Sequence, residues 1–148
     1  MRGCKAVAAA ASLWNLVLPT VSSLTMAKST TILFVDDDDE VRAPLAAQVR
    51  ADGFRVLEAR NTPEALRILA QEHIDVLFTD VVMPEPDGIE LAERARHLRP
   101  HIRVIFATGY LLRAATADKM GKLLFKPVRA KDILGALGEL MRESSSDA

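Results

Sequence analysis

The apolar positions of this chain change their spacing in a regular way from residue 31 onward. Short apolar runs without alternation, typical of strands buried on both faces of a parallel sheet, are separated by longer segments with helical spacing. The runs predict five strands, at 32–35, 54–57, 76–78 followed by Thr79-Asp80, 103–107 and 123–125. Strands that alternate with helices in this way predict an α/β fold with a doubly wound parallel sheet and right-handed crossovers.

The first two predicted helices carry signals at their starts. The first must begin near Glu40, so that Pro44 falls close to the first turn, where N–H groups have no intrahelical partner. Its expected buried face has a spacing of four residues and consists of Val41, Leu45 and Val49. Thr62 is the expected N-cap of the second helix, because Pro63 follows it at the first helical position.

The remaining helices are marked by their ends and by their apolar faces. Asp87-Gly88 opens the third helix, Pro100 stops it, and a short helix is expected over 111–119. The expected buried residues of the third helix are Ile89, Leu91, Ala92, Ala95 and Leu98. Those of the last helix are Ile133, Ala136, Leu137, Leu140 and Met141. Residues 143–148 are expected to form a frayed tail.

Composition narrows the possible settings and partners. The chain has 148 residues, enough for one domain with a real core, and its 19 basic and 20 acidic residues give a net charge of −1. This balance favours neither nucleic acid nor a membrane surface as a partner. Cys4 is a single cysteine and predicts a reducing, cytoplasmic setting. No apolar segment reaches the roughly 20 residues that a membrane span needs.

Reactive side chains stand at the ends of four predicted strands. The first strand ends in Asp36-Asp37, the third in Asp80, the fourth in Thr108 and the fifth in Lys126. Because the carboxyl ends of parallel strands share one edge, these groups are expected to meet there. Crowded carboxylates repel one another unless a cation lies among them, and oxygen ligands suit Mg²⁺. Lys126 and Thr108 can then hold phosphoryl oxygens, which leaves Asp80 to attack phosphorus.

The acidic run continues beyond the first strand with Asp38, Asp39 and Glu40. We interpret these residues as the N-cap and first-turn acids of the following helix, where negative charge is favoured by the helix dipole.

Four stretches of sequence carry a resemblance to a known family. They are ILFVDD at 32–37, DVLFTDVVMPEPDG at 75–88, FATGY at 106–110 and LLFKP at 123–127. Over residues 30–142 the chain resembles the response-regulator receiver domain of two-component phosphorelays. The resemblance implies a flavodoxin-like fold with strand order 2-1-3-4-5. The motif ATGY at 107–110 is similar to the corresponding motif of receivers attached to hybrid histidine kinases.

The resemblance also implies roles for individual residues. Asp80 would accept a phosphoryl group from a histidine kinase or a histidine phosphotransfer protein, and the signal would pass to a downstream protein that the sequence does not identify. Asp36, Asp37 and the Val82 carbonyl would hold Mg²⁺ together with Asp80. Thr108 and Lys126 would contact the phosphoryl group, and the bond from Lys126 to Pro127 would be cis. Such a domain is not an enzyme beyond catalysing its own phosphorylation and slow dephosphorylation.

One position departs from the family pattern in a way that bears on signalling. Leu123 stands three residues before Lys126, where the family usually has Tyr or Phe as the switch residue. Leucine at this position cannot report phosphorylation as an aromatic ring does. A second departure is Pro86, which replaces a commonly flexible apolar residue in the loop after Asp80.

Two other functions compete with the receiver interpretation. A phosphatase of the haloacid-dehalogenase type also uses a strand-end Asp, and Asp36 and Asp38 have the required spacing, although Glu40 and Val41 break the rest of its signature. A degenerate receiver could act as a constitutive binding module, but the complete set of site residues argues against this.

Residues 1–25 differ in character from the rest of the chain. Arg2 and Lys5 precede an apolar run over 6–18, which is a weak imitation of a secretory signal. The competing interpretation is that translation begins at Met26. Because export would separate the domain from a cytoplasmic phosphate donor, we expect a mis-assigned or dispensable leader.

Overall fold

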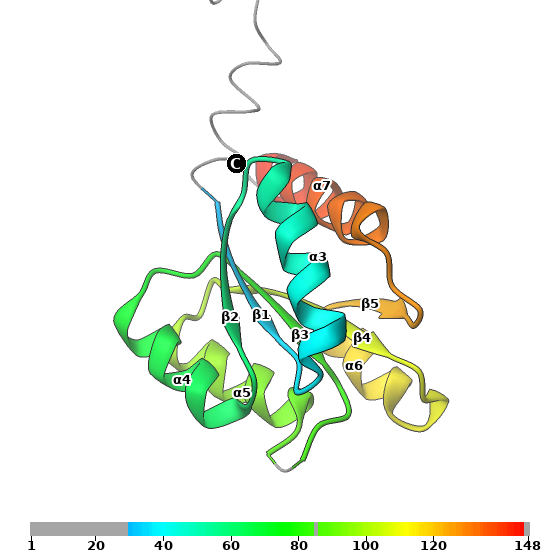
Figure 1. Ribbon diagram of the computed structural model, residues 1–148. Helices are drawn as coiled ribbons and strands as arrows, with labels where there is room; N and C mark the ends of the chain where they lie inside the picture. Colours follow the sequence, from blue (N-terminus) through cyan, green and yellow to red (C-terminus); the bar gives the residue numbers. More distant parts are fainter. Residues whose placement is uncertain (1–29, 85, 147–148) are drawn as a thin grey trace, which may run out of the picture.

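The computed structural model describes residues 30–84 and 86–146 and contains a five-stranded parallel sheet (Figure 1). The strand order is β2-β1-β3-β4-β5, as the family resemblance implies. The strands are β1 (Thr31–Val35), β2 (Arg55–Ala59), β3 (Val76–Asp80), β4 (Arg103–Thr108) and β5 (Lys122–Phe125). The predicted fold class is therefore confirmed.

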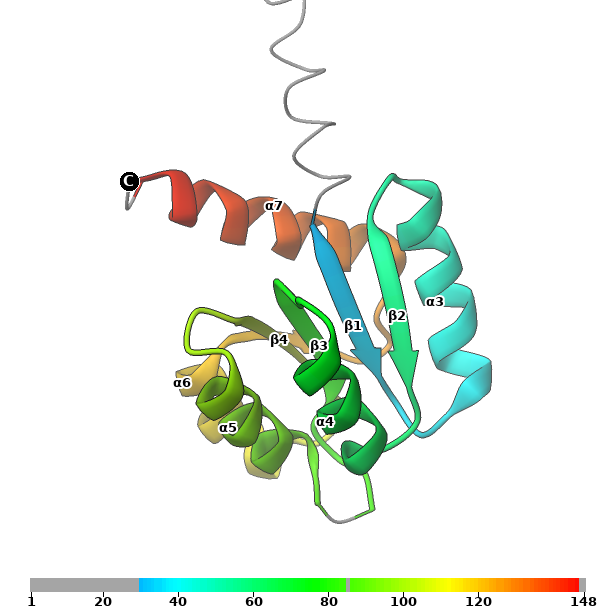
Figure 2. The same ribbon diagram turned by 90° about the vertical axis from the view of Figure 1, so that its left-hand side faces the viewer.

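The helices cover both faces of the sheet (Figures 1 and 2). One face carries α3 (Asp39–Ala51) and α7 (Ala130–Ser146). The other carries α4 (Thr62–Gln71), α5 (Gly88–Leu98) and α6 (Ala114–Met120), with a 3-10 turn over Leu111–Arg113 before α6. None of the helices in the described part of the chain is long and apolar enough to cross a membrane.

Each central strand feeds two separate hydrophobic cores, because successive side chains point to opposite faces of a sheet. On β1, Leu33 packs into the core under α4 and α5, whereas Phe34 packs into the core under α3 and α7. Phe34 meets Phe78 of β3 with ring centroids 4.8 Å apart. Each large apolar side chain that is buried in this way stabilises the fold by about 1.5–3 kcal/mol. Burial on both faces explains the unbroken apolar runs in the sequence.

Helix starts follow the sequence signals, with one shift. Asp38 caps α3 and Asp87 caps α5, each accepting a hydrogen bond from a first-turn amide. The cap of α4 is Asn61, not Thr62 as predicted, and its side chain accepts from the amide of Glu64 at 2.9 Å. The Thr62 hydroxyl instead donates to the Pro86 carbonyl oxygen at 2.7 Å. A tertiary contact thus draws the threonine away from the capping position.

The buried face of α3 differs from the predicted one. Val41 is 39% exposed and Leu45 only half-buried. The residues that face the sheet are Arg42, Ala46 and Val49. Ala46 is fully buried, and acidic partners make burial of the Arg42 guanidinium tolerable. The buried face of α3 is therefore rotated by about one residue from the predicted face.

Two further expectations about helix ends are wrong. Leu98 is 45% exposed, because the chain turns back at Arg99 and Ile102 fills the core at that end. The last helix continues to Ser146, so residues 143–146 are helical and not a frayed tail. No glycine or proline follows Gly138 to stop it. The predictions for residues 1–25 and 147–148 lie outside the described residues.

Candidate functional site

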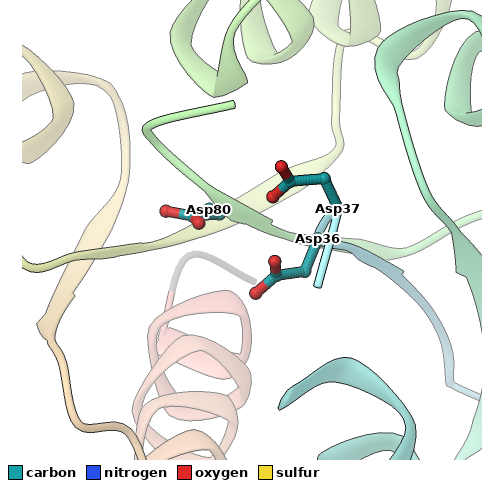
Figure 3. A group of neighbouring side chains, drawn as sticks. All are labelled: Asp36, Asp37 and Asp80. Atoms are coloured by element: carbon teal, nitrogen blue, oxygen red, sulfur yellow. The ribbon is translucent and has the colours of Figure 1, made fainter. Parts of the chain in front are cut away.

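Three carboxylates meet where β1 and β3 end at the carboxyl edge of the sheet (Figure 3). Asp80 is the last residue of β3, and Asp36 and Asp37 directly follow β1. One oxygen from each of the three side chains lies within 4.8 Å of the other two. Asp36 and Asp80 are buried, whereas Asp37 is exposed. The cluster predicted from the strand ends is thus brought together, with Asp37 on its solvent side.

Asp80 is held by hydrogen bonds on both of its carboxylate oxygens. The amide of Val82 donates to Oδ1 at 3.2 Å, and the ammonium of Lys126 donates to Oδ2 at 2.8 Å. The same ammonium lies 3.9 Å from Asp36 Oδ2. Lys126 therefore places positive charge between two of the carboxylates, at the point where the sequence predicted it.

Burial, hydrogen bonds and neighbouring charges shift the pKa values of Asp36 and Lys126. Burial raises the pKa of Asp36, even though the Asp38 amide and Lys126 favour its charged form. Burial alone would lower the pKa of Lys126, but its hydrogen bond to Asp80 and the neighbouring carboxylates raise it above the ordinary value. Lys126 is therefore firmly cationic, yet negative charge remains in excess at this edge. A donor set of clustered carboxylate oxygens fits a hard divalent cation such as Mg²⁺.

Asp38 and Asp39 belong to the start of α3 and not to the carboxylate cluster. Asp38 Oδ1 accepts from the Glu40 amide at 3.0 Å, as an N-cap does. Asp39 accepts from Arg42, and this hydrogen bond lowers the pKa of Asp39. The interpretation of these residues as capping and first-turn acids is confirmed. Asp38 is engaged as a helix cap and does not belong to the three-carboxylate cluster.

Thr108 lies on the neighbouring strand at the same edge, but its hydroxyl is engaged elsewhere. Asp80 pairs with Ala107 in the sheet register, and Thr108 follows it as the last residue of β4. The buried Thr108 Oγ1 accepts from the amide of Tyr110 at 3.0 Å. The structure brings Thr108 beside the cluster without a bond to Asp80. A contact with a phosphoryl group stays a prediction, as does the role of the Val82 carbonyl.

Lys126 directly follows β5, and its backbone is hydrogen-bonded to the end of β4. The Lys126 amide donates to the Thr108 carbonyl oxygen at 2.9 Å, and the Lys126–Pro127 peptide bond is cis, in agreement with the expectation. Leu123 is half-buried and packs against the core on the α4–α5–α6 side of the sheet. Its side chain therefore faces the core and not only the solvent.

Sequence reasoning missed Arg42, a buried cation next to the carboxylate cluster. Its Nη1 donates to the Asp36 carbonyl oxygen at 2.6 Å, and its Nε donates to Glu58 at 3.0 Å. A signal was present in the spacing, because Arg42 precedes Ala46 by four residues and Val49 by seven. A charged residue on such a stripe indicates a buried ionic contact.

The loop between β3 and α5 is tied to its neighbours on two sides. Thr62 at the start of α4 bonds the Pro86 carbonyl, and Arg113 forms an ion pair with Asp87. Asp87 also caps α5 through its other oxygen. The 3-10 turn after β4 and the loop after Asp80 are therefore in direct contact.

Comparison with known proteins identifies the family. The sequence model of the response regulator receiver domain matches residues 32–138, which is most of the chain. The chain belongs to the response regulator receiver family. The receiver is 33% identical to the response regulator receiver protein CpdR of Brucella abortus over 114 residues, which cover 74% of this chain and 95% of CpdR.

Two further similarities are to part of a sensor kinase and to a solved receiver domain protein. This receiver is 34% identical over 121 residues to the sensor kinase CckA of Brucella abortus, covering 78% of this chain but 13% of CckA. The crystal structure of a response regulator receiver domain protein from Clostridium thermocellum matches with a TM-score of 0.73 and 31% identity, over 80% of this chain and 99% of that one.

Family membership settles the class of function. The receiver is a phosphoacceptor domain of two-component signalling. The comparisons give no support to a haloacid-dehalogenase-type phosphatase or to a constitutive binding module.

Proposed function

We propose that Asp80 is the phosphoacceptor and that it takes its phosphoryl group from a histidine kinase or a histidine phosphotransfer protein. The observation that carries this proposal is the setting of the Asp80 carboxylate, which lies between the Lys126 ammonium and the Val82 amide within the acidic cluster. Asp38 and Asp39, the next acids along the chain from the cluster, have capping and ion-pair roles. Asp80 combines a strand-end position with a cation at hydrogen-bond distance.

The transfer is a nucleophilic displacement at phosphorus. A carboxylate oxygen of Asp80 attacks, an O–P bond forms, and the P–N bond to the donor imidazole breaks. The electron pair of that bond returns to the imidazole nitrogen, and the product is an aspartyl phosphate. Lys126, now 2.8 Å from Asp80 Oδ2, would offset charge on the phosphoryl oxygens. The Thr108 hydroxyl would have to leave Tyr110 to reach the same group.

Magnesium fits the same edge of the sheet. Asp36, Asp37, Asp80 and the Val82 carbonyl would hold the ion, which when bound supplies positive charge against the carboxylates and the phosphoryl group. Burial raises the pKa of Asp36 even with Lys126 beside it, so a bound divalent cation would further favour its charged form.

A surface suited to a protein partner adjoins the site. A pocket of about 590 Å³ beside Asp36 and Lys126 is lined largely by apolar side chains from α3 and from the segment after β5. They include Val41, Leu45, Pro127 and Val128. An apolar surface next to the acceptor suits a donor protein better than a small phosphate ester.

The remaining features of the proposal concern setting and turnover. The protein would act in the cytoplasm, where histidine kinases present their phosphoryl groups, and would signal to a downstream protein rather than to nucleic acid or membrane. A net charge of −1 supports the absence of both anionic partners. Its catalysis would be limited to its own phosphorylation and slow dephosphorylation.

Phosphorylation from a small acyl-phosphate donor tests the proposal. The purified chain is expected to gain one phosphoryl group by intact mass, at least about tenfold more slowly after chelation of Mg²⁺, because the phosphoryl charge then faces uncompensated carboxylates. Asp37→Asn is expected to show the same loss. Asp38→Asn is the matched control, since asparagine caps a helix as well as aspartate does. Equal rates with and without chelator would contradict the role of the metal.

Hydrogen exchange tests how the phosphorylated state is transmitted. Leu123 already fills an inward position and lacks a hydroxyl, so the two states should differ little in free energy at β5. A stable phosphoryl mimic is therefore expected to change exchange in the loops around Asp87 and Tyr110 more than over residues 123–140. Leu123→Tyr should extend the change to β5 and α7. Equally strong new protection over 123–140 in the parent protein would contradict this expectation.

A further inference from the structure

Arg42 of α3 is almost completely buried and uses all three of its guanidinium nitrogens. Its side chain is 8% exposed. Nη1 donates to the Asp36 carbonyl oxygen at 2.6 Å, Nε to Glu58 at 3.0 Å, and Nη2 to Asp39 at 2.6 Å. The guanidinium therefore joins three segments, namely the turn after β1, the first turn of α3 and the strand β2. Charge-assisted bonds of this kind have strict geometry.

The bond to the Asp36 carbonyl acts on the residue that follows. The carbonyl of Asp36 and the amide of Asp37 belong to one planar peptide unit, so fixing the direction of the carbonyl fixes the plane from which Asp37 continues. Two other bonds hold the same residue, because the Asp36 amide donates to Ala59 and the Asp36 carboxylate accepts from the Asp38 amide at 3.0 Å. Arg42 completes this set from the helix side.

Arg50 shows what an arginine does here when it only joins α3 to β2. It lies on the same helix and bonds to the same partner, with Nη2 3.1 Å from Glu58 and 2.9 Å from the Val56 carbonyl oxygen. Its side chain is 44% exposed, and both of these partners lie on β2. Unlike Arg50, Arg42 is buried and contacts the acidic turn and Asp39 in addition to β2.

We propose that Arg42 is a positioning residue for the metal site, holding the peptide between Asp36 and Asp37 so that both carboxylates face Asp80. This inference rests on the proposed Mg²⁺ site of the phosphoacceptor. Arg42 does not contact the reacting atoms. It acts through the backbone of the turn, as groups that orient metal ligands commonly do.

A Mg²⁺ titration of the full-length chain by calorimetry tests the proposal. Arg42→Gln is expected to weaken Mg²⁺ binding by about tenfold, the usual cost of losing a group that orients a ligand. Arg50→Gln, the matched control, is expected to stay within about twofold of the parent protein, because it leaves the turn intact. Circular dichroism establishes that each variant is folded at the temperature of the titration, so that a general loss of stability is not read as a loss of affinity.

The possible outcomes separate this inference from the proposed function. If the parent protein binds no Mg²⁺, or if Asp37→Asn binds it as tightly, the proposed metal site fails and the role of Arg42 fails with it. If the parent binds Mg²⁺ and Arg42→Gln does so equally well, or no worse than Arg50→Gln, only the role of Arg42 is overturned. Should Arg42→Gln not fold, Arg42→Lys retains the buried charge without the three-way contact. It is expected to lose about threefold or more in affinity, and unchanged affinity would overturn the proposal.

Discussion

Asp80→Asn is expected to lower phosphoryl labelling of this receiver by at least about a hundredfold, because an amide oxygen is a far weaker nucleophile than a carboxylate. Asparagine has nearly the same shape and keeps an oxygen that can accept from the Val82 amide. What it loses is the negative charge that pairs with Lys126. The measurement is intact mass after incubation with a small acyl phosphate and Mg²⁺, with Asp118→Asn, an exposed acid on α6, as the control.

The stability of the same variant makes the labelling result interpretable. Asp80 is one of three clustered acids, so removing its charge relieves repulsion when no metal is present. The thermal midpoint of Asp80→Asn without Mg²⁺ is therefore expected to equal or exceed that of the parent. A folded variant that labels as strongly as the parent would show that the acceptor is another residue.

Gly88→Ala is expected to destabilise the domain by about 3 kcal/mol, because there is no room for a β-carbon at this position. A Cβ on Gly88 would lie 2.0 Å from the carbonyl oxygen of Asp80. That oxygen is part of the backbone of β3, and the Gly88 amide itself donates to the Val81 carbonyl at 3.0 Å. Neither side can move without separating α5 from the strand that carries the acceptor. Urea unfolding monitored by circular dichroism measures the loss.

Gly135→Ala provides the opposite control within the same fold. Gly135 lies inside α7, and a Cβ there would meet nothing within 4 Å. Alanine is the better helix former, so this variant is expected to gain about 0.5–1 kcal/mol. A loss of less than about 1 kcal/mol at Gly88 would contradict the close contact between α5 and β3.

Gly88→Ala is expected to slow phosphorylation by more than its loss of folded protein explains. The contact at Gly88 is made by the main chain of Asp80 itself, so a shift there displaces the acceptor relative to Lys126. Slower labelling of the folded fraction is therefore expected in this variant and not in Gly135→Ala. Small displacements of a reacting group cost rate because the geometry of attack is narrow.

The sequence by itself determined the fold class and most of the reactive edge. The apolar run before Asp80 has no alternation because β3 is covered on both faces. Burial on both faces requires apolar residues at successive positions, so it is visible in the local sequence. Once the strands are parallel, their carboxyl ends must share one edge. The sequence alone therefore predicts that Asp36, Asp80 and Lys126 lie together.

Only the tertiary structure decided which polar groups bond to one another at that edge. The helical spacing places Arg42 on the buried face of α3, but it does not show that Glu58, sixteen residues away, and the Asp36 carbonyl accept hydrogen bonds from its guanidinium. Thr62 does not cap α4 as predicted, and its hydroxyl donates instead to the Pro86 carbonyl, twenty-four residues further along the chain. A hydrogen bond needs donor and acceptor within a few tenths of an ångström of their ideal separation. Apolar burial tolerates far looser placement, which is why its pattern is readable in the sequence and the polar network is not.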